Sequence, residues 1–254
     1  MNSISLHDYA ALVGSPFLRA SIRREGFGRG EGCYESFMDQ LYADIDGHIY
    51  HMQSNRELRK GDSEDRLSAD IIAGLKVQGY AATADTKTGG HVDISVTLGG
   101  YSWIGEAKKD GNFKEGFLQL TTRYVPASGN YAHNQGGLIF YMVESDNAEG
   151  RLNDWRSALT QNGHVCSDCK NNVLAFYSDH TLEGSGTSFK VRTMAVALHH
   201  GPKDKSARTS EARRAAKEPL ASAAEKRVAK AQVGPTESKR PGRLASAKAK
   251  LQGR

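Results

Sequence analysis

The pattern of apolar and polar residues predicts a chain of mixed helices and strands. Apolar side chains recur every three or four residues in segments that predict helices over residues 34–50, 63–77, 113–124 and 152–159. Runs rich in β-branched and aromatic residues predict strands over residues 80–86, 91–98, 101–108, 138–143, 173–177 and 189–198. Residues 1–30 lack a clear pattern, and the glycines between positions 26 and 32 predict a mobile loop there.

The strongest local signal is the Gly99-Gly100 pair between two alternating strands. Two glycines between such strands predict a two-residue hairpin turn, in which both positions are expected to have φ > 0. Leu98 then faces Tyr101, and each cross-strand pair has residue numbers that sum to 199. This register places Asp93 opposite Glu106.

The same register predicts one apolar and one polar face for the hairpin. Like charges directly opposite each other destabilise a sheet, so Asp93 and Glu106 on the polar face require compensation. A divalent cation is the obvious candidate, because Mg²⁺ prefers oxygen ligands. Lys108 follows Glu106 on the same strand face. A solvated Lys–Glu pair is the simpler alternative.

Asp93 followed by Glu106-Ala107-Lys108 resembles the PD-(D/E)xK nuclease superfamily, which has the restriction-endonuclease-like fold. The resemblance covers about residues 60–145. The proline that the family places before the acid is absent, because Val92 stands there. The family implies an αβββαβ core, a central mixed sheet flanked by helices, and this order matches the elements predicted above.

The resemblance implies a metal-dependent site for phosphodiester hydrolysis. Asp93, Glu106 and the carbonyl of Ala107 would hold Mg²⁺, or Mn²⁺ in its place. Lys108 would orient the attacking water and favour its deprotonation. Glu64, on the helix before the strands, would reach the metal or the lysine, although Asp65 is its rival and an acid in a first helical turn is also favoured by the helix dipole.

Further residues are weaker candidates. Gln119 resembles a glutamine that some branches carry on the helix after the Glu-x-Lys strand, often with a tyrosine four residues on. Tyr124 is five residues on, so only Gln119 is carried over. Arg123 would contact a phosphate, or both side chains belong to a solvated helix face. His91, expected opposite Lys108, and Lys109 are candidates for nucleic-acid contacts, with ordinary surface positions as the alternative.

Cys166 and Cys169 form a single CxxC with His164 and His180 nearby. A zinc site normally shows four ligands at recognisable spacing, and no second CxxC exists. We expect two ordinary reduced thiols, with zinc as the alternative.

Charge is distributed unevenly along the chain. Residues 203–254 hold 15 Lys/Arg and 5 Asp/Glu, a net charge of +10, which leaves −5 for residues 1–202 out of the total of +5. This basic tail has no aromatic residue, so we expect it to be disordered and to contact phosphates without sequence preference, or merely to aid solubility. There is no apolar run of 18 residues and no secretory signal pattern, which predicts a cytoplasmic protein without a membrane segment.

These observations predict an α/β protein with an N-terminal helical extension (1–60), a nuclease-like core (61–200) and a disordered basic tail (201–254). The expected function is Mg²⁺-dependent cleavage of DNA, in restriction or phage defence. The alternatives are a non-cleaving nucleic-acid-binding protein on the same fold, and a nuclease that acts on RNA or awaits a partner. Enzymes of this type often dimerise, which keeps a homodimer open.

Overall fold

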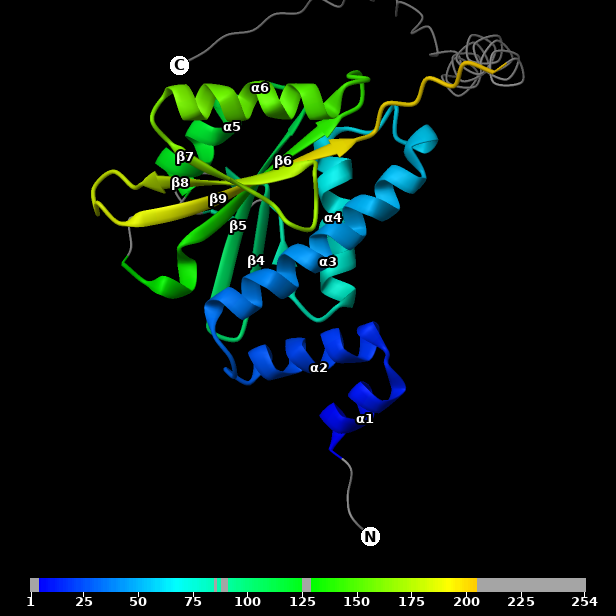
Figure 1. Cartoon of the computed structure of the whole chain (residues 1–254), viewed down its shortest axis with the longest axis vertical. Helices are drawn as coiled ribbons and strands as arrows, with labels where there is room; N and C mark the ends of the chain where they lie inside the picture. Colours follow the sequence, from blue (N-terminus) through cyan, green and yellow to red (C-terminus); the bar gives the residue numbers. More distant parts are fainter. Residues whose placement is uncertain (1–4, 85, 88–90, 125–128, 205–254) are drawn as a thin grey trace, which may run out of the picture. The chain divides into compact units, whose positions relative to one another are not determined.

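The computed structural model describes residues 5–84, 86–87, 91–124 and 129–204, and shows a mixed sheet flanked by helices (Figure 1). Residues Met1–His200 belong to one compact unit. The helices are α1 (Leu6–Val13), α2 (Pro16–Gly28), α3 (Tyr34–Ser54), α4 (Glu64–Val77), α5 (Phe113–Gln119) and α6 (Ala148–Gln161). None of the described helices combines the length and apolarity needed to span a bilayer.

Seven strands form the main sheet in the order β1-β4-β5-β6-β9-β8-β7. Their bounds are β1 (Ala81–Thr83), β4 (Ile94–Leu98), β5 (Tyr101–Lys109), β6 (Gln135–Met142), β7 (Val165–Asp168), β8 (Ala175–Thr181) and β9 (Ser188–Ala197). The β5–β6 and β6–β9 pairs are parallel and the other pairs are antiparallel. A separate pair, β2 (Thr86–Lys87) and β3 (His91–Val92), precedes β4. A helix followed by strands, a helix and a strand is present from α4 to β6, but the two short strands β2 and β3 stand between β1 and β4.

Helices cover both faces of the sheet, and the sheet separates the core into two clusters. On one face, α3 and α4 pack over β4 and β5, where Ile94, Val96 and Trp103 are buried. On the other face, α5 and α6 pack over the middle strands, around Leu138 and Phe140. β6 contributes to both clusters, as predicted from its uninterrupted apolar sequence.

The hairpin register is confirmed over five pairs, from Leu98–Tyr101 to Ile94–Gly105. The turn differs from the prediction, because Gly99 has φ +59° while Gly100 does not have a positive φ. One left-handed position at the first glycine is typical of a type II′ turn, which also suits the twist of a hairpin. Glycine is required at this first position for a second reason: an added Cβ at Gly99 would lie 2.2 Å from the carbonyl oxygen of Phe27.

Two predictions about the hairpin ends were wrong. Pairing of β4 with β5 stops at Ile94, and the chain bends at Asp93, so Asp93 does not pair with Glu106. His91 pairs with Lys87 in the small sheet and not with Lys108. The bend arises because β3 turns away to join β2.

The N-terminal region also differs from the prediction of a loop. Gly26 and Gly28 belong to α2, which begins at Pro16 after the cap Ser15, whose hydroxyl accepts a hydrogen bond from the Leu18 N–H. Proline in the first turn and a serine cap are both standard helix-start signals. Strand β7 was not predicted. The expected disorder of the tail concerns residues 205–254, which lie outside the described residues.

The hairpin turn makes a testable contrast between its two glycines. Gly99→Ala should lower the free energy of unfolding by about 2 kcal/mol or more, because of the left-handed φ and the close carbonyl of Phe27. Gly100→Ala meets nothing within 4 Å and should stay within about 0.5 kcal/mol of the wild type. Urea unfolding of the three proteins measures both values, and equal stability of the two variants would contradict the turn geometry.

Candidate active site

The candidate site lies on β5, at the point where β4 leaves it. The N–H groups of Ala107 and Lys109 point toward the vacated edge and find no strand there. Asp93 Oδ2 accepts the N–H of Ala107 at 2.8 Å, and Glu64 Oε2 accepts the N–H of Lys109 at 2.5 Å. Because buried N–H groups need partners, these two carboxylates complete the strand edge and are fixed in place by it.

Glu64 reaches this edge from the first turn of α4. The helix begins there because the Ser63 hydroxyl accepts the N–H of Arg66 at 3.2 Å. The stripe of Leu67, Ile71 and Leu75 is fully buried and turns the helix so that Glu64 faces β5. The rival acid, Asp65, is exposed. The structure therefore selects Glu64.

The ammonium group of Lys108 lies among three carboxylates. Its Nζ donates to Glu106 Oε1 and lies 3.8 Å from both Glu64 Oε1 and Asp93 Oδ2. Burial alone would lower the pKa of Lys108, but the carboxylates outweigh burial and raise it. With every group ionised, three carboxylates and one ammonium carry a formal charge of −2. Lys108 is therefore a firmly charged cation in a cluster that remains short of positive charge.

Glu106 is the most buried acid of this cluster. Its side chain is 2% exposed, and its Oε2 accepts no hydrogen bond from any described residue. Burial raises the pKa of Glu106 to about 7, Lys108 opposes this rise, and the charge of Asp93 adds to it. The Asp93 carboxyl lies within hydrogen-bonding reach of the Glu106 carboxyl. Such a contact is favourable only when one group holds a proton or when both bind a cation.

Helix α5 covers the polar face of β5 at close range. A Cβ added to Gly116 would lie 3.2 Å from Lys108 Cγ and 3.7 Å from Glu106 Cγ, so a glycine is what lets the helix approach. The loop before α5 is tied to the end of β6, because Asp110 Oδ1 accepts the N–H of Val143 at 2.8 Å. Asn112 then caps the helix.

A π turn at the end of α5 brings in a residue that the sequence prediction left out. Residues Leu120–Tyr124 form a π-helix, whose hydrogen bonds run from i to i+5. Tyr124 is 5% exposed. The pKa of its hydroxyl is raised, mainly by burial and secondly by the charge of Glu106. Asp93 adds to this rise. The π turn packs against β5, and Tyr124 is five residues after Gln119, whereas the resemblance led us to expect a tyrosine four residues on. A π turn is the missing signal.

The remaining candidates differ in position. Gln119 is half-buried, and its buried Oε1 has no hydrogen-bond partner within the described part of the chain. Arg123 is exposed on the π turn. Lys109 donates through Nζ to the carbonyl of Asp62 at 2.7 Å, so it holds the loop before α4. His91 is exposed on the small β2–β3 sheet.

The donor set at β5 suits a hard cation. Among the residues that the structure describes, no three His, Cys, Asp or Glu side chains are grouped so as to hold a metal ion. Mg²⁺ usually takes only one or two carboxylates, with water and substrate phosphate oxygens as further ligands. Asp93 and Glu106 supply two, including the unpartnered Oε2. The Ala107 carbonyl faces the same edge as its N–H, because both groups of a strand residue point to one side.

The two cysteines of the CxxC lie against different faces of the sheet. Cys166 packs with the α5–α6 cluster, whereas Cys169 packs with the α3–α4 cluster and accepts a hydrogen bond from Arg192 at 3.4 Å. His164 and His180 face each other, with their Nδ1 atoms 3.1 Å apart. The four residues of the zinc alternative therefore do not converge on one point.

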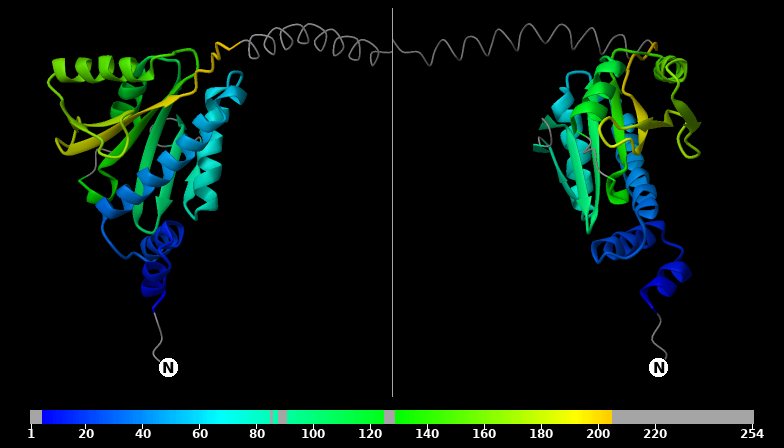
Figure 2. Two further views of the ribbon diagram at one scale, coloured as in Figure 1. Left: turned by 45° about the vertical axis from the view of Figure 1, so that its right-hand side comes forward. Right: turned by 90° about the vertical axis from the view of Figure 1, so that its left-hand side faces the viewer.

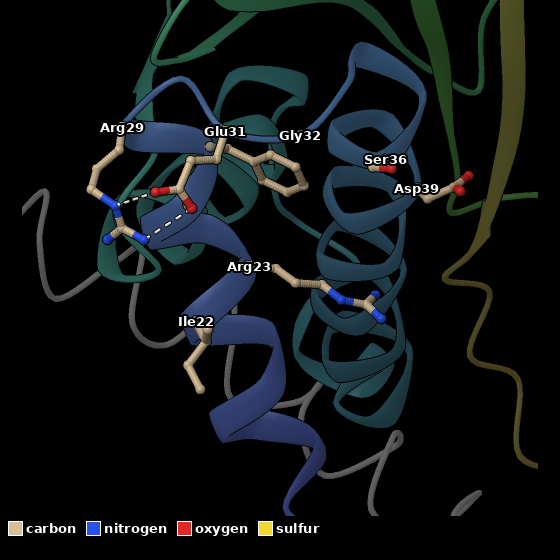
Figure 3. A pocket seen from close by; sticks show the side chains of 9 residues that line it. Ile22, Arg23, Arg29, Glu31, Gly32, Ser36 and Asp39 are labelled. Carbon is tan, nitrogen blue, oxygen red and sulfur yellow. Dashed lines mark hydrogen bonds and ion pairs between the residues drawn. The ribbon is translucent and has the colours of Figure 1, made fainter. Parts of the chain in front are cut away.

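A separate hollow of about 450 Å³ lies between α2 and α3, with walls that include Arg23, Ser36 and Asp39 (Figure 3). Two of its four charged residues form an ion pair, in which Arg29 donates to Glu31 at 2.8 and 3.1 Å. None of the acids at β5 lines this hollow. The buried acid with a raised pKa, Glu106, therefore lies at β5 and not in this hollow.

The buried histidine pair predicts a pH dependence of stability. His180 is 6% exposed, and burial, with the charge of His164 as a second cause, lowers its pKa from 6.5 to about 4. A histidine whose pKa is lower in the folded protein than in the unfolded chain favours folding when it is neutral. This contribution is fully present above pH 6.5, the ordinary pKa, and is lost as the pH falls toward 4. The stability advantage of the wild type over His180→Gln should fall by about 3 kcal/mol between pH 7 and pH 4.

Urea unfolding at both pH values measures this difference. His51→Gln, at an exposed position, is the control and should show a constant difference from the wild type. A constant difference for His180→Gln as well would show that the pKa of His180 is not lowered.

Comparison of the chain with protein-family models, with curated proteins and with solved structures gives no match. The cluster around Lys108 is therefore the feature of the molecule that indicates a function.

Proposed function

We propose that the protein is a Mg²⁺-dependent nuclease of the PD-(D/E)xK type that hydrolyses phosphodiester bonds of DNA. The observation that carries this proposal is the gathering of Asp93, Glu106 and Lys108 at one edge of β5, with an unpartnered carboxylate oxygen and a net negative charge. The main-sheet strands β1, β4 and β5 between α4 and α5, followed by β6, support it, because that superfamily has an αβββαβ core. The short strands β2 and β3 are an addition to that core.

Asp93 and Glu106, with the Ala107 carbonyl, would hold the cation. A bound Mg²⁺, or Mn²⁺, lowers the pKa of water and neutralises charge that develops on the phosphate. Its double charge would balance the −2 of the cluster, and it would satisfy Glu106 Oε2. Zinc chemistry has no comparable support, since Cys166 and Cys169 are on opposite faces.

Lys108 would position the attacking water. Its ammonium contacts Glu106 Oε1 in the structure, and Glu64 and Asp93 lie 3.8 Å away. When Glu106 turns to a cation, Glu64 keeps the ammonium in place and charged. Glu64 therefore acts through Lys108 and through the N–H of Lys109, as a positioning residue.

Gln119 and Tyr124 would line the substrate side of the cluster. Both polar groups belong to the end of α5 and its π turn, and the charges of Glu106 and Asp93 raise the pKa of Tyr124. A neutral hydroxyl and an amide suit hydrogen bonds to a phosphodiester without adding negative charge. Arg123, exposed on the same turn, would contact a neighbouring phosphate.

The choice of DNA, and a role in restriction or phage defence, follows from the resemblance to the superfamily. The competing functions are a non-cleaving nucleic-acid-binding protein and a nuclease for RNA or one activated by a partner. Supercoiled DNA, linear single-stranded DNA and RNA, each with Mg²⁺ or with EDTA, separate these functions by the presence and substrate of cleavage.

The first test removes the charges that the proposal requires. Asp93→Asn and Lys108→Ala should each reduce Mg²⁺-dependent cleavage by about 100-fold or more, because each removes a group that acts on the transition state. Lys170→Ala, at an exposed position, is the control and should keep wild-type activity. Mg²⁺ should raise the melting temperature of the wild type but not of Asp93→Asn. Cleavage by Lys108→Ala at the wild-type rate would refute the catalytic assignment.

The second test compares two neighbouring acids on α4. Glu64→Gln keeps an acceptor for the Lys109 N–H but loses the charge beside Lys108, so kcat should fall by about 10-fold, a typical loss for a residue that supports a site residue. KM should change little, and the pH profile of kcat should shift. Asp65→Asn, one residue on and exposed, should leave kcat unchanged. Equal behaviour of the two variants would remove Glu64 from the site.

A further inference from the structure

The N-terminal helices carry an apolar surface that the rest of the described chain leaves uncovered. Five of the twelve large apolar side chains exposed among the described residues fall within twelve residues of sequence. They are Leu6, Tyr9, Leu12, Val13 and Phe17, with exposed fractions from 50% to 78%. In α1, the one described side chain that is buried is Ala10.

This surface is unusual because α1 has little else to stabilise it. The helix has eight residues and packs mainly against α2, and Figure 2 shows it beyond α2 on the side away from the sheet. Ser5 caps its start and Gly14 its end. Caps contribute about 1 kcal/mol each, and helices this short are marginal in water without a packed apolar face. An additional surface that covers α1 would remove this deficit.

A matching groove lies on the same part of the molecule. A hollow of about 330 Å³ is formed by α2, the end of α4 and β4. Its lining combines the apolar Phe17, Val77 and Leu98 with the polar Ser21, Arg24, Glu25 and Gln78. Val77 is 90% exposed although it is a large apolar residue. The chain thus carries an uncovered apolar helix and, beside it, a groove whose lining includes the exposed apolar side chains of Phe17 and Val77.

We propose that α1 of one copy binds the groove of a second copy, and that the exchange is reciprocal in a two-fold dimer. A two-fold contact buries the same surface on both copies, so each helix finds a groove. The five side chains of the N-terminal helices and Val77, each at least half exposed, would all be covered in such a dimer. They would form the apolar centre of an interface that needs about 800 Å² per partner. The inference is independent of the proposed nuclease chemistry.

Two other occupants fit less well. A lipid surface favours helices with Lys or Arg on the polar face. Four of the five exposed apolar side chains belong to α1, which has Asp8 and no Lys or Arg, whereas Arg19 and Arg23 lie on α2. The chain's own tail, residues 203–254, contains no aromatic residue and is rich in Ala, Lys and Arg, so it offers little to fill an apolar groove. A second copy supplies both apolar elements.

Sedimentation equilibrium of the full chain tests the proposal. The wild type should sediment with twice the chain mass of 27.6 kDa. Leu12→Glu, on the helix, and Val77→Glu, in the groove, should each weaken the dimer by about 10-fold or more, because each places a charge in the contact. Val173→Glu is the matched control, since Val173 is 84% exposed and lies outside the groove. Melting curves establish that every variant is folded.

Cross-linking identifies the contact. Chains with Leu12→Cys are mixed with chains carrying Val77→Cys, both with Cys33→Ser, and a disulfide between the two new thiols should form in the mixture. A wild-type chain that sediments as a monomer at every concentration overturns the proposal. A dimer that withstands both glutamate variants and forms no such cross-link places the interface elsewhere and equally overturns it.

Discussion

The candidate site depends on one structural constraint, which is the early end of β4. A central strand that loses its neighbour leaves N–H groups without acceptors, and each buried orphan costs about 1–3 kcal/mol. Here the carboxylates of Asp93 and Glu64 accept the N–H groups of Ala107 and Lys109. The acids therefore have a structural role before any chemical one. They also arrive at the site already oriented, because the strand edge determines where they lie.

The same constraint explains the position of Lys108. Completing the edge with carboxylates gathers negative charge beside Glu106, which burial already makes hard to ionise. The ammonium of Lys108 reduces the repulsion among the carboxylates, but a single positive charge does not balance three negative ones. Lys108 therefore offsets part of the repulsion within the cluster, and its ion pairs with Glu64 and Asp93 would remain if Glu106 were to hold a cation. The residue that offsets the charge of the three acids is the one that the proposed reaction needs.

Much of this arrangement follows from local patterns in the sequence. The Gly99-Gly100 turn determines the register of β4 and β5, and the uninterrupted apolar run predicts the buried β6. Alternation cannot reveal where β4 ends, because the bend at Asp93 depends on β3 pairing with β2. For that reason Asp93 was expected opposite Glu106, whereas it bonds to the backbone of Ala107. α1 was missed because its apolar side faces outward, so the usual link between pattern and core is lost.

Tyr124 shows why spacing in sequence does not translate directly into position. An i, i+4 relationship holds only in an α-helix, and the π turn shifts the matching position by one residue. π turns are frequent at functional sites, since they re-aim side chains at some cost in helix geometry. At the start of the same segment, Gly116 brings α5 close to Lys108 and Glu106. Both departures from ideal helix sequence or geometry place α5 against the acid cluster. Their common location argues that this helix is shaped by the cluster beneath it and not by packing alone.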